Sequence, residues 1–511
     1  MLMRKIFILL CACCLGSVVA QAQEFSAVNA DGVTLYYSVT GEGEAEIVRH
    51  PQYIERVGYE GDVVIPASVE HDGVDYAVTG IGETAFGYCD KLTSVSMPAS
   101  IERIGESAFA GCELLKAIEI PASVKSIGDY VFEETALTEI HIPAAVESIG
   151  EEVFGWCLDL KTITVDGENP RYDSRDNCNA IIETESNTLI SGCAGTVIPG
   201  TVEHIGHAAF YFTGLESVVL PASVRTIGPN AFQGTPLKSV EIPDGVTEIG
   251  MAAFLDCRQL TSVVLPESLT EIDTLTFQYC FLLKEIKLPS ALTRICVGAF
   301  NYCFSLETIE LPASLKEIES LAFSYCLSLR EVCCRAADVP AMGEKVEELY
   351  VFTPNYCENL SWSYDEDGDL DFYSLKCDGV YRAVLRVPQA SVEAYRAATG
   401  WGTGDCWSEE DDVLYYEWEF SLGIDGEVCN YFHDIQPIGG ETSTEGTVAD
   451  GSFTVYSDGG VIYIDGAAQD VEVYDITGRR IYGGNSTAVS VGRSGAYIVR
   501  SGDEVRKVMV R

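Results

Sequence analysis

Cysteine is the most reactive residue type that recurs in this sequence of 511 residues, with 19 copies. Seven cysteines stand three residues after a phenylalanine, at Cys89, Cys112, Cys157, Cys257, Cys280, Cys303 and Cys326. Threonine takes the same place at Thr135, Thr213 and Thr235, where the next leucine follows one residue sooner. Because the residue type follows turn length, we interpret the cysteines as small buried thiols and the threonines as hydroxyls that bond their own backbone. Equivalent positions one repeat apart come within disulfide reach, so the sequence leaves pairing open.

Other residues that could do chemistry form weak patterns. His204 and His207 have a spacing that could serve a metal, but as variants on a repeat turn they fit solvent-facing positions better. Four aspartates alternate as calcium ligands sometimes do, yet a hairpin turn explains them: Asp365, Asp367, Asp369 and Asp371. The sequence has no glycine-rich phosphate loop and no nucleophile elbow. We therefore predict no catalytic residue, no metal and no cofactor; a secreted hydrolase remains a remote alternative.

A sequence repeat determines where these residues lie in the fold. Phenylalanines recur every 22 or 23 residues in two runs, at Phe86, Phe109, Phe132 and Phe154, then at Phe210, Phe232, Phe254, Phe277, Phe300 and Phe323. Such a period indicates a solenoid, in which each unit buries its apolar side against the next. In one unit, Val263 and Leu265 alternate as in a short strand, and Leu269, Ile272 and Phe277 follow on a helical or irregular convex arc. We predict a mixed α/β solenoid with a parallel sheet on its concave face.

The string "IP-x-SV-xx-IG-xx-AF-xx-C-xx-L" occurs about ten times between residues 60 and 335. It closely resembles the BspA-like leucine-rich repeats of bacterial cell-surface proteins. The resemblance implies a leucine-rich-repeat solenoid, with an interruption at 166–195 that separates Phe154 from Phe210. It also implies adhesion to host matrix proteins or contact between bacteria. Asp273, Cys296 and Glu319 replace the usual glycine after isoleucine, so their turns are expected to differ.

The N-terminus and the charge bear on location. Residues 1–22 combine a basic stretch, an apolar run and a cleavage site between Ala22 and Gln23, which is typical of a secretory signal peptide. No later stretch has the roughly 20 apolar residues of a membrane span. With 78 acidic against 32 basic residues, the chain carries a formal charge of −46, which disfavours nucleic acid and anionic lipid as partners. We expect an exported protein that is attached to the outer-membrane surface or secreted.

The remaining segments suggest caps and a separate domain. Residues 23–59 predict an N-terminal hairpin cap, 336–438 an irregular C-terminal cap region, 439–450 a linker, and 451–511 a small all-β sandwich. The motifs "VEVYDITGRRIYGG" and "GAYIVRSGDEVRKVMVR" look like the type A C-terminal sorting domain of the type IX secretion system. By that resemblance the outer-membrane secretion machinery would recognise Gly478, Arg479, Gly495, Tyr497 and Lys507 and remove the domain. An ordinary β-domain, retained in the mature protein, is the alternative.

With no catalytic site predicted, the remaining candidate for function is a binding surface on the solenoid. The predicted outward positions on the concave strands are Ser96, Glu119, His141, Thr164, Val219, Glu241, Val264, Lys287 and Glu310. Solenoids use such faces to hold partners, although this strip lacks the aromatic anchors of a strong hot spot. We predict a non-catalytic, adhesin-like binding protein for host matrix or bacterial surface proteins or glycans. The alternative is a glycan-binding module that uses the aromatic-rich region 341–435, whose aromatic residues could instead pack as a cap.

Overall fold

The computed structural model describes residues 24–51, 58–343, 356–364, 370–381, 383–398 and 432–437. In the C-terminal segment it describes 454–458, 461–465, 471–475, 479–484, 488–491, 495–501 and 504–510. The chain divides into two compact units, of which the first holds most of the repeats up to Glu307 together with 317–328. Thr308–Lys316, Leu329–Met342 and the residues from Pro354 onward belong to the second. The predicted signal peptide and its cleavage site at Ala22 and Gln23 lie outside the described residues.

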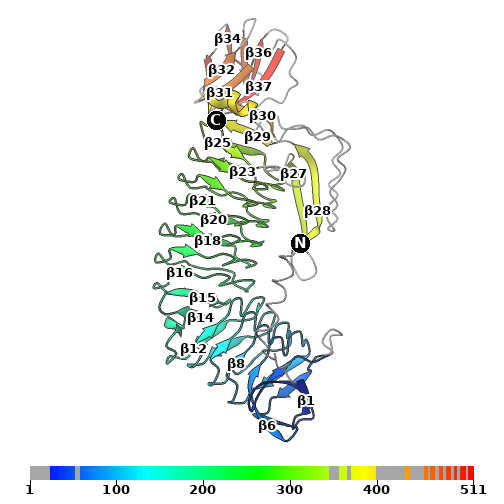
Figure 1. Cartoon of the computed structure of the whole chain (residues 1–511). Coiled ribbons are helices and arrows are strands. Elements are labelled where there is room, and N and C mark those ends of the chain that lie inside the picture. The colour runs from blue at the N-terminus through cyan, green and yellow to red at the C-terminus, as the bar shows by residue number, and fades with distance from the viewer. Residues whose placement is uncertain are drawn as a thin grey trace, which may run out of the picture. The chain divides into compact units, whose positions relative to one another are not determined.

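In the first unit the repeats are coils that stack one upon the next (Figure 1). Several coils contribute longer strands, which pair with their neighbours, and these are β4 (Gly61–Val64), β7 (Leu92–Ser96), β10 (Glu139–Ile142), β12 (Thr162–Val165), β18 (Ser239–Glu241) and β20 (Ser262–Val264). Their pairs are parallel: β4 with β7, β10 with β12, and β18 with β20. We call the outer side of this ladder the long-strand face. It corresponds to the predicted sheet.

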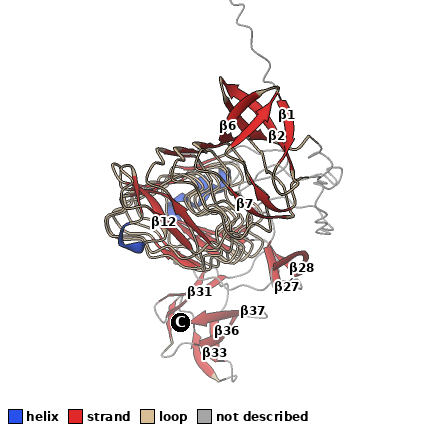
Figure 2. Cartoon of the chain, turned by 90° about the horizontal axis from the view of Figure 1, so that it is seen from below, coloured by secondary structure: helices blue, strands red, loops and turns tan. Residues whose placement is uncertain are grey.

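A second parallel ladder, which the sequence did not predict, runs through the part of each coil around "RIG" or "SIG". Its strands are mostly two residues long: β6 (Val74–Ile81), β8 (Arg103–Ile104), β9 (Ser126–Ile127), β11 (Ser148–Ile149), β16 (His204–Ile205), β17 (Thr226–Ile227), β19 (Glu248–Ile249), β21 (Glu271–Ile272), β22 (Arg294–Ile295) and β24 (Glu317–Ile318). Ile272, which we had placed on a convex arc, lies in β21. In the view along the stack, the strands of the coils are joined by loops and turns (Figure 2).

The mixed α/β class was therefore wrong for the repeats. Among residues 58–343 the structure contains no α-helix, only the short 3₁₀-helix η2 (Arg175–Asn177). The reason is local: in each coil the residues two before and two after the phenylalanine have positive φ, as in Leu275 at 58° and Tyr279 at 61° around Phe277. An α-helix needs φ near −60° at every residue. The arc instead forms successive tight turns.

The phenylalanines fill the centre of the stack. Phe86, Phe109, Phe132 and Phe154 lie with neighbouring ring centroids 5.2 to 5.8 Å apart and with nearly parallel planes. The six phenylalanines of the second run stack in the same way, at 5.1 to 5.6 Å. Around each ring the backbone also bonds from coil to coil; the N–H of Phe277, for example, donates to the carbonyl of Ala299 at 2.8 Å. Backbone hydrogen bonds at the long strands, at the short strands and around the phenylalanines thus connect the coils.

The ladder cysteines are buried and form no disulfide among the described residues. From Cys112 onward their thiols donate to the phenylalanine carbonyl of an earlier coil, as Cys257 does to Phe232 at 3.1 Å and Cys280 to Phe254 at 3.3 Å, whereas Cys89 accepts from the N–H of Tyr59. The threonine hydroxyls donate to the phenylalanine carbonyl of their own coil, as Thr235 does to Phe232 at 2.8 Å. The interpretation of cysteine and threonine as alternative turn residues is therefore confirmed. The thiol also ties successive coils together.

The interruption after β12 remains part of the stack. It forms η2 and the strands β13 (Tyr172–Asp173), β14 (Ala180–Glu183) and β15 (Thr188–Gly192); β13 pairs antiparallel with β14, and β14 with β15. β15 then pairs in parallel with β16 and so starts the short-strand ladder of the second run. Gly192 lies against the next coil, where an added Cβ would come within 2.1 Å of the Phe210 ring. This insert therefore takes the place of a coil between Phe154 and Phe210.

At the N-terminal end, β1 (Glu24–Val28), β2 (Thr34–Gly41) and β3 (Glu44–Val48) form an antiparallel meander. β3 pairs in parallel with β6, and β5 (Ser68–His71) also pairs with β6. Leu35, Tyr37 and Ile47 of this meander are buried in one core with the first coils. The meander thereby covers apolar residues that the first coil would otherwise expose.

In the second unit, β23 (Thr308–Leu311), β25 (Glu331–Cys334), β29 (Ala383–Val387) and β30 (Phe432–Pro437) form a parallel sheet. The unit also holds β26 (Ala341–Met342), η3 (Gln389–Ser391) and α1 (Val392–Ala397), the one α-helix among the described residues. Tyr395 of α1 is buried, and its hydroxyl donates to the carbonyl of Ala336 at 2.9 Å. The strands β27 (Tyr356–Tyr364) and β28 (Leu370–Tyr381) form the predicted hairpin.

The C-terminal segment contains two antiparallel sheets. The first consists of β31 (Thr454–Asp458), β32 (Val461–Asp465) and β35 (Ala488–Ser490), and the second of β33 (Val471–Asp475), β34 (Arg480–Gly484), β36 (Gly495–Ser501) and β37 (Glu504–Val510). Ile462, Val473, Val489 and Val499 from the two sheets are buried in one core. The sheets therefore pack face to face. No helix in the described part of the chain is long and apolar enough to span a membrane.

Candidate functional site

The side chains predicted to face outward do so. All nine positions from Ser96 to Glu310 that we had assigned to the binding strip are exposed, while their strand neighbours, such as Val95, Ile140 and Ile163, are buried. The alternation follows from the pleat, in which successive side chains of a strand point to opposite sides. Eight of the nine belong to the first unit; Glu310 belongs to the second.

Part of the long-strand face is hollowed. A depression of about 710 Å³ spans four successive coils of the first run. It is lined by Val95, Ala117, Ile118, Glu119, Ile120, Ala122, Glu139, Ile140, His141, Pro143, Ala144, Thr162, Thr164 and Asp166. The volume falls within the range of small-ligand sites in proteins. Three of the predicted residues, Glu119, His141 and Thr164, line this hollow, and Ser96 adjoins its member Val95.

The hollow coincides with an interruption of the long-strand ladder. β7 pairs only with β4 and β10 only with β12, and the intervening segment 116–120 forms no strand. In the described chain, the one backbone hydrogen bond of this segment runs from the N–H of Thr138 to the carbonyl of Lys116, at 3.3 Å. The sheet is therefore not continuous at this point, and the hollow lies over the interruption.

Two columns of outward side chains cross the hollow. The register of β10 and β12 aligns His141 with Thr164 and Glu139 with Thr162. The repeat places Glu119 in the first column and Ala117 in the second. The His141 Nδ1 and Thr164 Oγ1 atoms are hydrogen-bonded at 3.0 Å. Polar groups thus stand beside apolar lining residues, of which Val95, Ile120 and Ile140 are buried.

The hollow is acidic. Glu119, Glu139 and Asp166 contribute carboxylates, and its lining includes neither lysine nor arginine nor any aromatic ring besides the imidazole of His141. Sequence reasoning missed Glu139 and Thr162, because it followed only one outward position per strand. The position two residues earlier, which points to the same side of a strand, is the signal that would have found them.

The rest of the predicted strip has another character. Val219 is 85% exposed and Val264 57% exposed, so the second run presents apolar side chains. Lys287 pairs with Glu267, whose pKa falls to about 2 because it accepts hydrogen bonds from Lys287 and from the backbone of Ser290. In the second unit, Glu310 pairs with Arg335. The nine positions therefore do not form a uniform surface.

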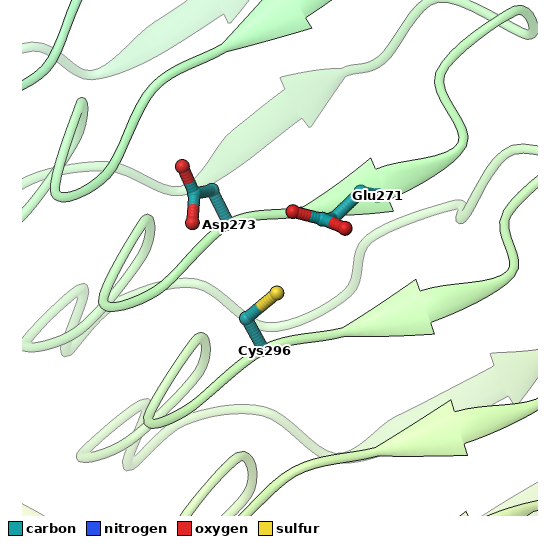
Figure 3. Close-up of side chains that lie close together, drawn as sticks. All are labelled: Glu271, Asp273 and Cys296. Carbon is teal, nitrogen blue, oxygen red and sulfur yellow. The ribbon is translucent and has the colours of Figure 1, made fainter.

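Glu271, Asp273 and Cys296 lie close together on adjacent coils (Figure 3). One donor atom from each lies within 4.8 Å of the other two, and thiolate with carboxylate is a donor set that zinc accepts. The arrangement also has an explanation without a metal. The Arg294 guanidinium donates to Glu271 at 3.2 Å, and burial and the Glu271 carboxylate raise the pKa of the Cys296 thiol to about 12. The thiol is thereby held in its protonated form.

The histidines considered as metal ligands have other partners. His204 Nδ1 is hydrogen-bonded to Thr226 Oγ1 at 2.8 Å, and His207 Nδ1 lies 3.6 Å from a carboxylate oxygen of Glu151. Of the four alternating aspartates, Asp365, Asp367 and Asp369 lie outside the described residues, and only the backbone of Asp371 is described, in β28.

Sequence reasoning overlooked an aromatic ladder on the turns of the second run. Tyr279, Tyr302 and Tyr325 are partly buried and stack on one another, with centroids 4.8 and 4.5 Å apart. Beneath them, Phe281 and Phe304 are buried with centroids 5.0 Å apart. The repeat contains the signal, since each tyrosine stands two residues after a core phenylalanine. Because these rings pack against each other, we assign the ladder to stability.

The other predicted sites are only partly described. Arg479 and Tyr497 lie in the C-terminal segment: the N–H of Arg479 donates to the Asp475 carboxylate at 3.0 Å, and Tyr497 is buried. Gly495 and Lys507 lie in β36 and β37, while Gly478 falls outside the described residues. In the aromatic-rich region 341–435, the side chains that would contact a glycan are likewise outside them.

Solved structures of other proteins share features of this chain. A leucine-rich cell-surface protein from Faecalibacterium prausnitzii is 25% identical, over 61% of this chain and 94% of that one, with a TM-score of 0.38. A leucine-rich repeat protein from Eubacterium ventriosum is 22% identical, over 60% and 90%, with a TM-score of 0.46. The pneumococcal vaccine antigen PcpA is 16% identical, over 73% and 95%, with a TM-score of 0.45. No curated protein matches the chain.

The repeats themselves match a family model. Six copies of the BspA type leucine rich repeat region cover residues 76–179 and 203–330. These two ranges contain the phenylalanine stacks, the cysteine ladder and the hollow of the first run, and part of the insert separates them. Residues 76–179 and 203–330 are thus similar to the BspA type leucine rich repeat region.

Proposed function

We propose that this protein is an exported, non-catalytic binding protein that holds a macromolecule of a host or bacterial surface on its long-strand face. The observation that carries the proposal is the hollow of about 710 Å³ on that face. Repeat solenoids use extended faces of this kind for binding. The lining combines exposed hydrogen-bonding groups with apolar side chains, which is the composition of a recognition site.

The chemistry of the hollow favours recognition over catalysis. A general acid–base pair or an activated nucleophile needs its groups within hydrogen-bond reach of each other and of a bound substrate. The one side-chain pair at that distance among the lining residues is His141 with Thr164, on the exposed surface of a sheet. A glycan normally stacks on aromatic rings, and apart from an imidazole this hollow has none. We therefore favour a protein ligand over a glycan.

The proposal is tested by filling the hollow with a large side chain. Ala122 and Ala222 occupy the same place in two "PASV" motifs, and both are exposed, but only Ala122 lines the hollow. Binding of the mature chain, from Gln23, to matrix proteins and to glycans is measured for the Ala122→Trp and Ala222→Trp variants. Loss of binding with Ala122→Trp alone supports the proposal. Equal binding by both variants and the unchanged protein, or turnover of any glycan or peptide, contradicts it.

Location is a separate part of the proposal. The secretory signal at residues 1–22 and the resemblance of 451–511 to a sorting domain support export to the outer-membrane surface. We expect mass spectrometry of the protein from its native cells to show an N-terminus at Gln23 and loss of the C-terminal domain. A mature chain that still ends at Arg511 would contradict sorting by cleavage and favour a retained β-domain.

A further inference from the structure

The hollow has a chemistry that selects among protein ligands. We propose that its ligand is an extended polypeptide segment that carries lysine or arginine side chains, an inference that rests on the proposed function of the hollow. Three carboxylates, from Glu119, Glu139 and Asp166, face a space that no lysine or arginine lines. Carboxylates at the wall of a depression concentrate field lines and attract cations.

The spacing of the carboxylates suits more than one cationic group. Glu119 and Glu139 lie on neighbouring coils and in different columns. Paired strands are about 4.8 Å apart and alternate residues of a strand about 6.7 Å apart, and segment 116–120 does not pair with β10, so the two side chains start roughly 8 Å or more from each other. Asp166 follows β12, two coils beyond Glu119. A ligand that presents cations at similar intervals can meet them together.

The form of the hollow favours a peptide over a small polyamine. Four coils cover about 14 Å between the first and the last, the length of about four residues of an extended chain. Ala117, Ala122 and Ala144 leave room for aliphatic side-chain stems, and Thr162 offers a hydroxyl group to a peptide backbone. Lysine and arginine use both parts, since their stems pack on apolar surface while the charged ends reach the carboxylates.

The overall charge of −46 would attract any cation weakly, so the test compares two places on the same face. Glu119 and Glu139 line the hollow, whereas Glu241 is equally exposed on β18 outside it. Their replacement by glutamine keeps side-chain size and removes charge. The Glu119→Gln/Glu139→Gln double variant and the Glu241→Gln control should both fold, which circular dichroism can establish.

The probes are the fluorescein-labelled peptide Lys-Val-Lys-Val-Lys, its twin with acetylated lysines, and spermidine as competitor. For the intact mature chain we expect binding of the lysine peptide to weaken about tenfold in the double variant and less than about twofold in Glu241→Gln. Binding should also weaken steeply with salt, because the contacts are exposed ion pairs. Equal binding of the acetylated twin, or complete displacement by spermidine at the peptide's own concentration, would overturn the inference.

The outcome also separates this inference from the proposed function. If Ala122→Trp abolishes binding of a matrix protein while the double variant binds it normally, the hollow is the site but its ligand is not selected by positive charge. If Ala122→Trp leaves binding of every matrix protein and of the lysine peptide unchanged, both the site and its ligand class are wrong.

Discussion

The two runs of coils share one repeat and differ in what they place on their surfaces. In the first run, from β4 to β12, an acidic hollow lies on the long-strand face. The second run, which holds the phenylalanines from Phe210 to Phe323, presents Val219 and Val264 on the same face and an aromatic ladder on its turns. Both runs keep the phenylalanine stack and the buried thiols. The comparison teaches that the repeat fixes the interior, while outward positions are free to diverge toward binding or toward stability.

The phenylalanine stack gives the largest expected effect. Phe109 has a ring partner on each side, whereas Phe154 stacks on Phe132 alone at the end of its run. Phe109→Ala should lower the free energy of unfolding by roughly 3 to 5 kcal/mol, through lost burial and a residual cavity. Phe154→Ala should cost about 1 kcal/mol less, the worth of one ring pair. Chemical denaturation measures both.

Phe254→Ala is the matched variant in the second run, since Phe254 also stacks on two rings. It should cost about as much as Phe109→Ala. A loss below about 1 kcal/mol in either run would show that this run does not depend on its ring stack.

The stack also shows what could be predicted from sequence. Phe86 and its equivalents recur at fixed intervals, so their burial, the parallel strands and the exposed side of each strand followed from periodicity alone. The second strand at Ile272 did not, because a two-residue strand has no alternation to detect. The turns at Leu275 and Tyr279 were also missed, since leucine and tyrosine rarely adopt positive φ. Stacking against the next coil imposes that conformation.

The candidate site was predictable only in part. Glu119, His141 and Thr164 were placed correctly on the outer face, because the repeat aligns them. The hollow itself was not foreseen: the segments "AIEIP" and "EIHIP" look alike, yet only the second forms a strand, β10. Whether two adjacent coils complete their hydrogen bonds depends on their spacing in three dimensions, which a single sequence does not reveal. The same holds for Cys296, which reaches Glu271 only through the stacking of coils.

Replacement of the glycine that follows isoleucine in most coils, which we call the glycine column, should have the next largest effect on stability. An added Cβ at Gly128 would lie 2.6 Å from the backbone nitrogen of Glu106 in the preceding coil. Gly128→Ala should therefore cost about 1 to 3 kcal/mol, the usual cost of overpacking. Cys296 takes the same position in the second run, where the coils already accommodate a side chain, so Cys296→Ala should cost less. Thermal denaturation gives the comparison.

Gly167 serves as the control for this column, because an added Cβ there meets no atom within 4 Å. Gly167→Ala should leave stability unchanged within about 0.5 kcal/mol. A Gly128→Ala variant that melts with the unchanged protein would show that the first run tolerates wider spacing than its contacts indicate.

The buried thiols predict a loss of stability at alkaline pH. Burial raises the pKa of Cys257 from 9.0 to about 12. Above pH 9 the unfolded chain releases this proton while the folded chain retains it, so stability is complete below pH 9 and falls as the pH rises toward 12. At pH 10 the free energy of unfolding should be lower than at pH 7 by about 1.4 kcal/mol for each such thiol. Denaturation at the two pH values, with reductant present, measures it.

The second run holds Cys257, Cys280, Cys303 and Cys326, the first run only Cys89, Cys112 and Cys157. A hydrogen-exchange comparison at the two pH values should therefore show the larger loss in the second run. Cys257→Ala should remove its share of the pH dependence while lowering stability at pH 7 by about 1 kcal/mol through the lost hydrogen bond. A disulfide between ladder cysteines, detected by mass mapping, would remove the basis of this prediction.

Surface charge should give the smallest effect and again differ between the runs. Lys125 and Glu102 form an exposed pair on the first run, so Lys125→Gln should change stability by less than about 0.5 kcal/mol. Arg294 in the second run faces three carboxylates, from Glu271, Glu317 and Glu319. Removal of the Arg294 guanidinium leaves these like charges together, so Arg294→Gln should lower the free energy of unfolding more than Lys125→Gln does. Added salt should reduce this difference by screening the charges. Equal effects of the two variants at low salt would show that the Arg294 network contributes no more than an isolated pair.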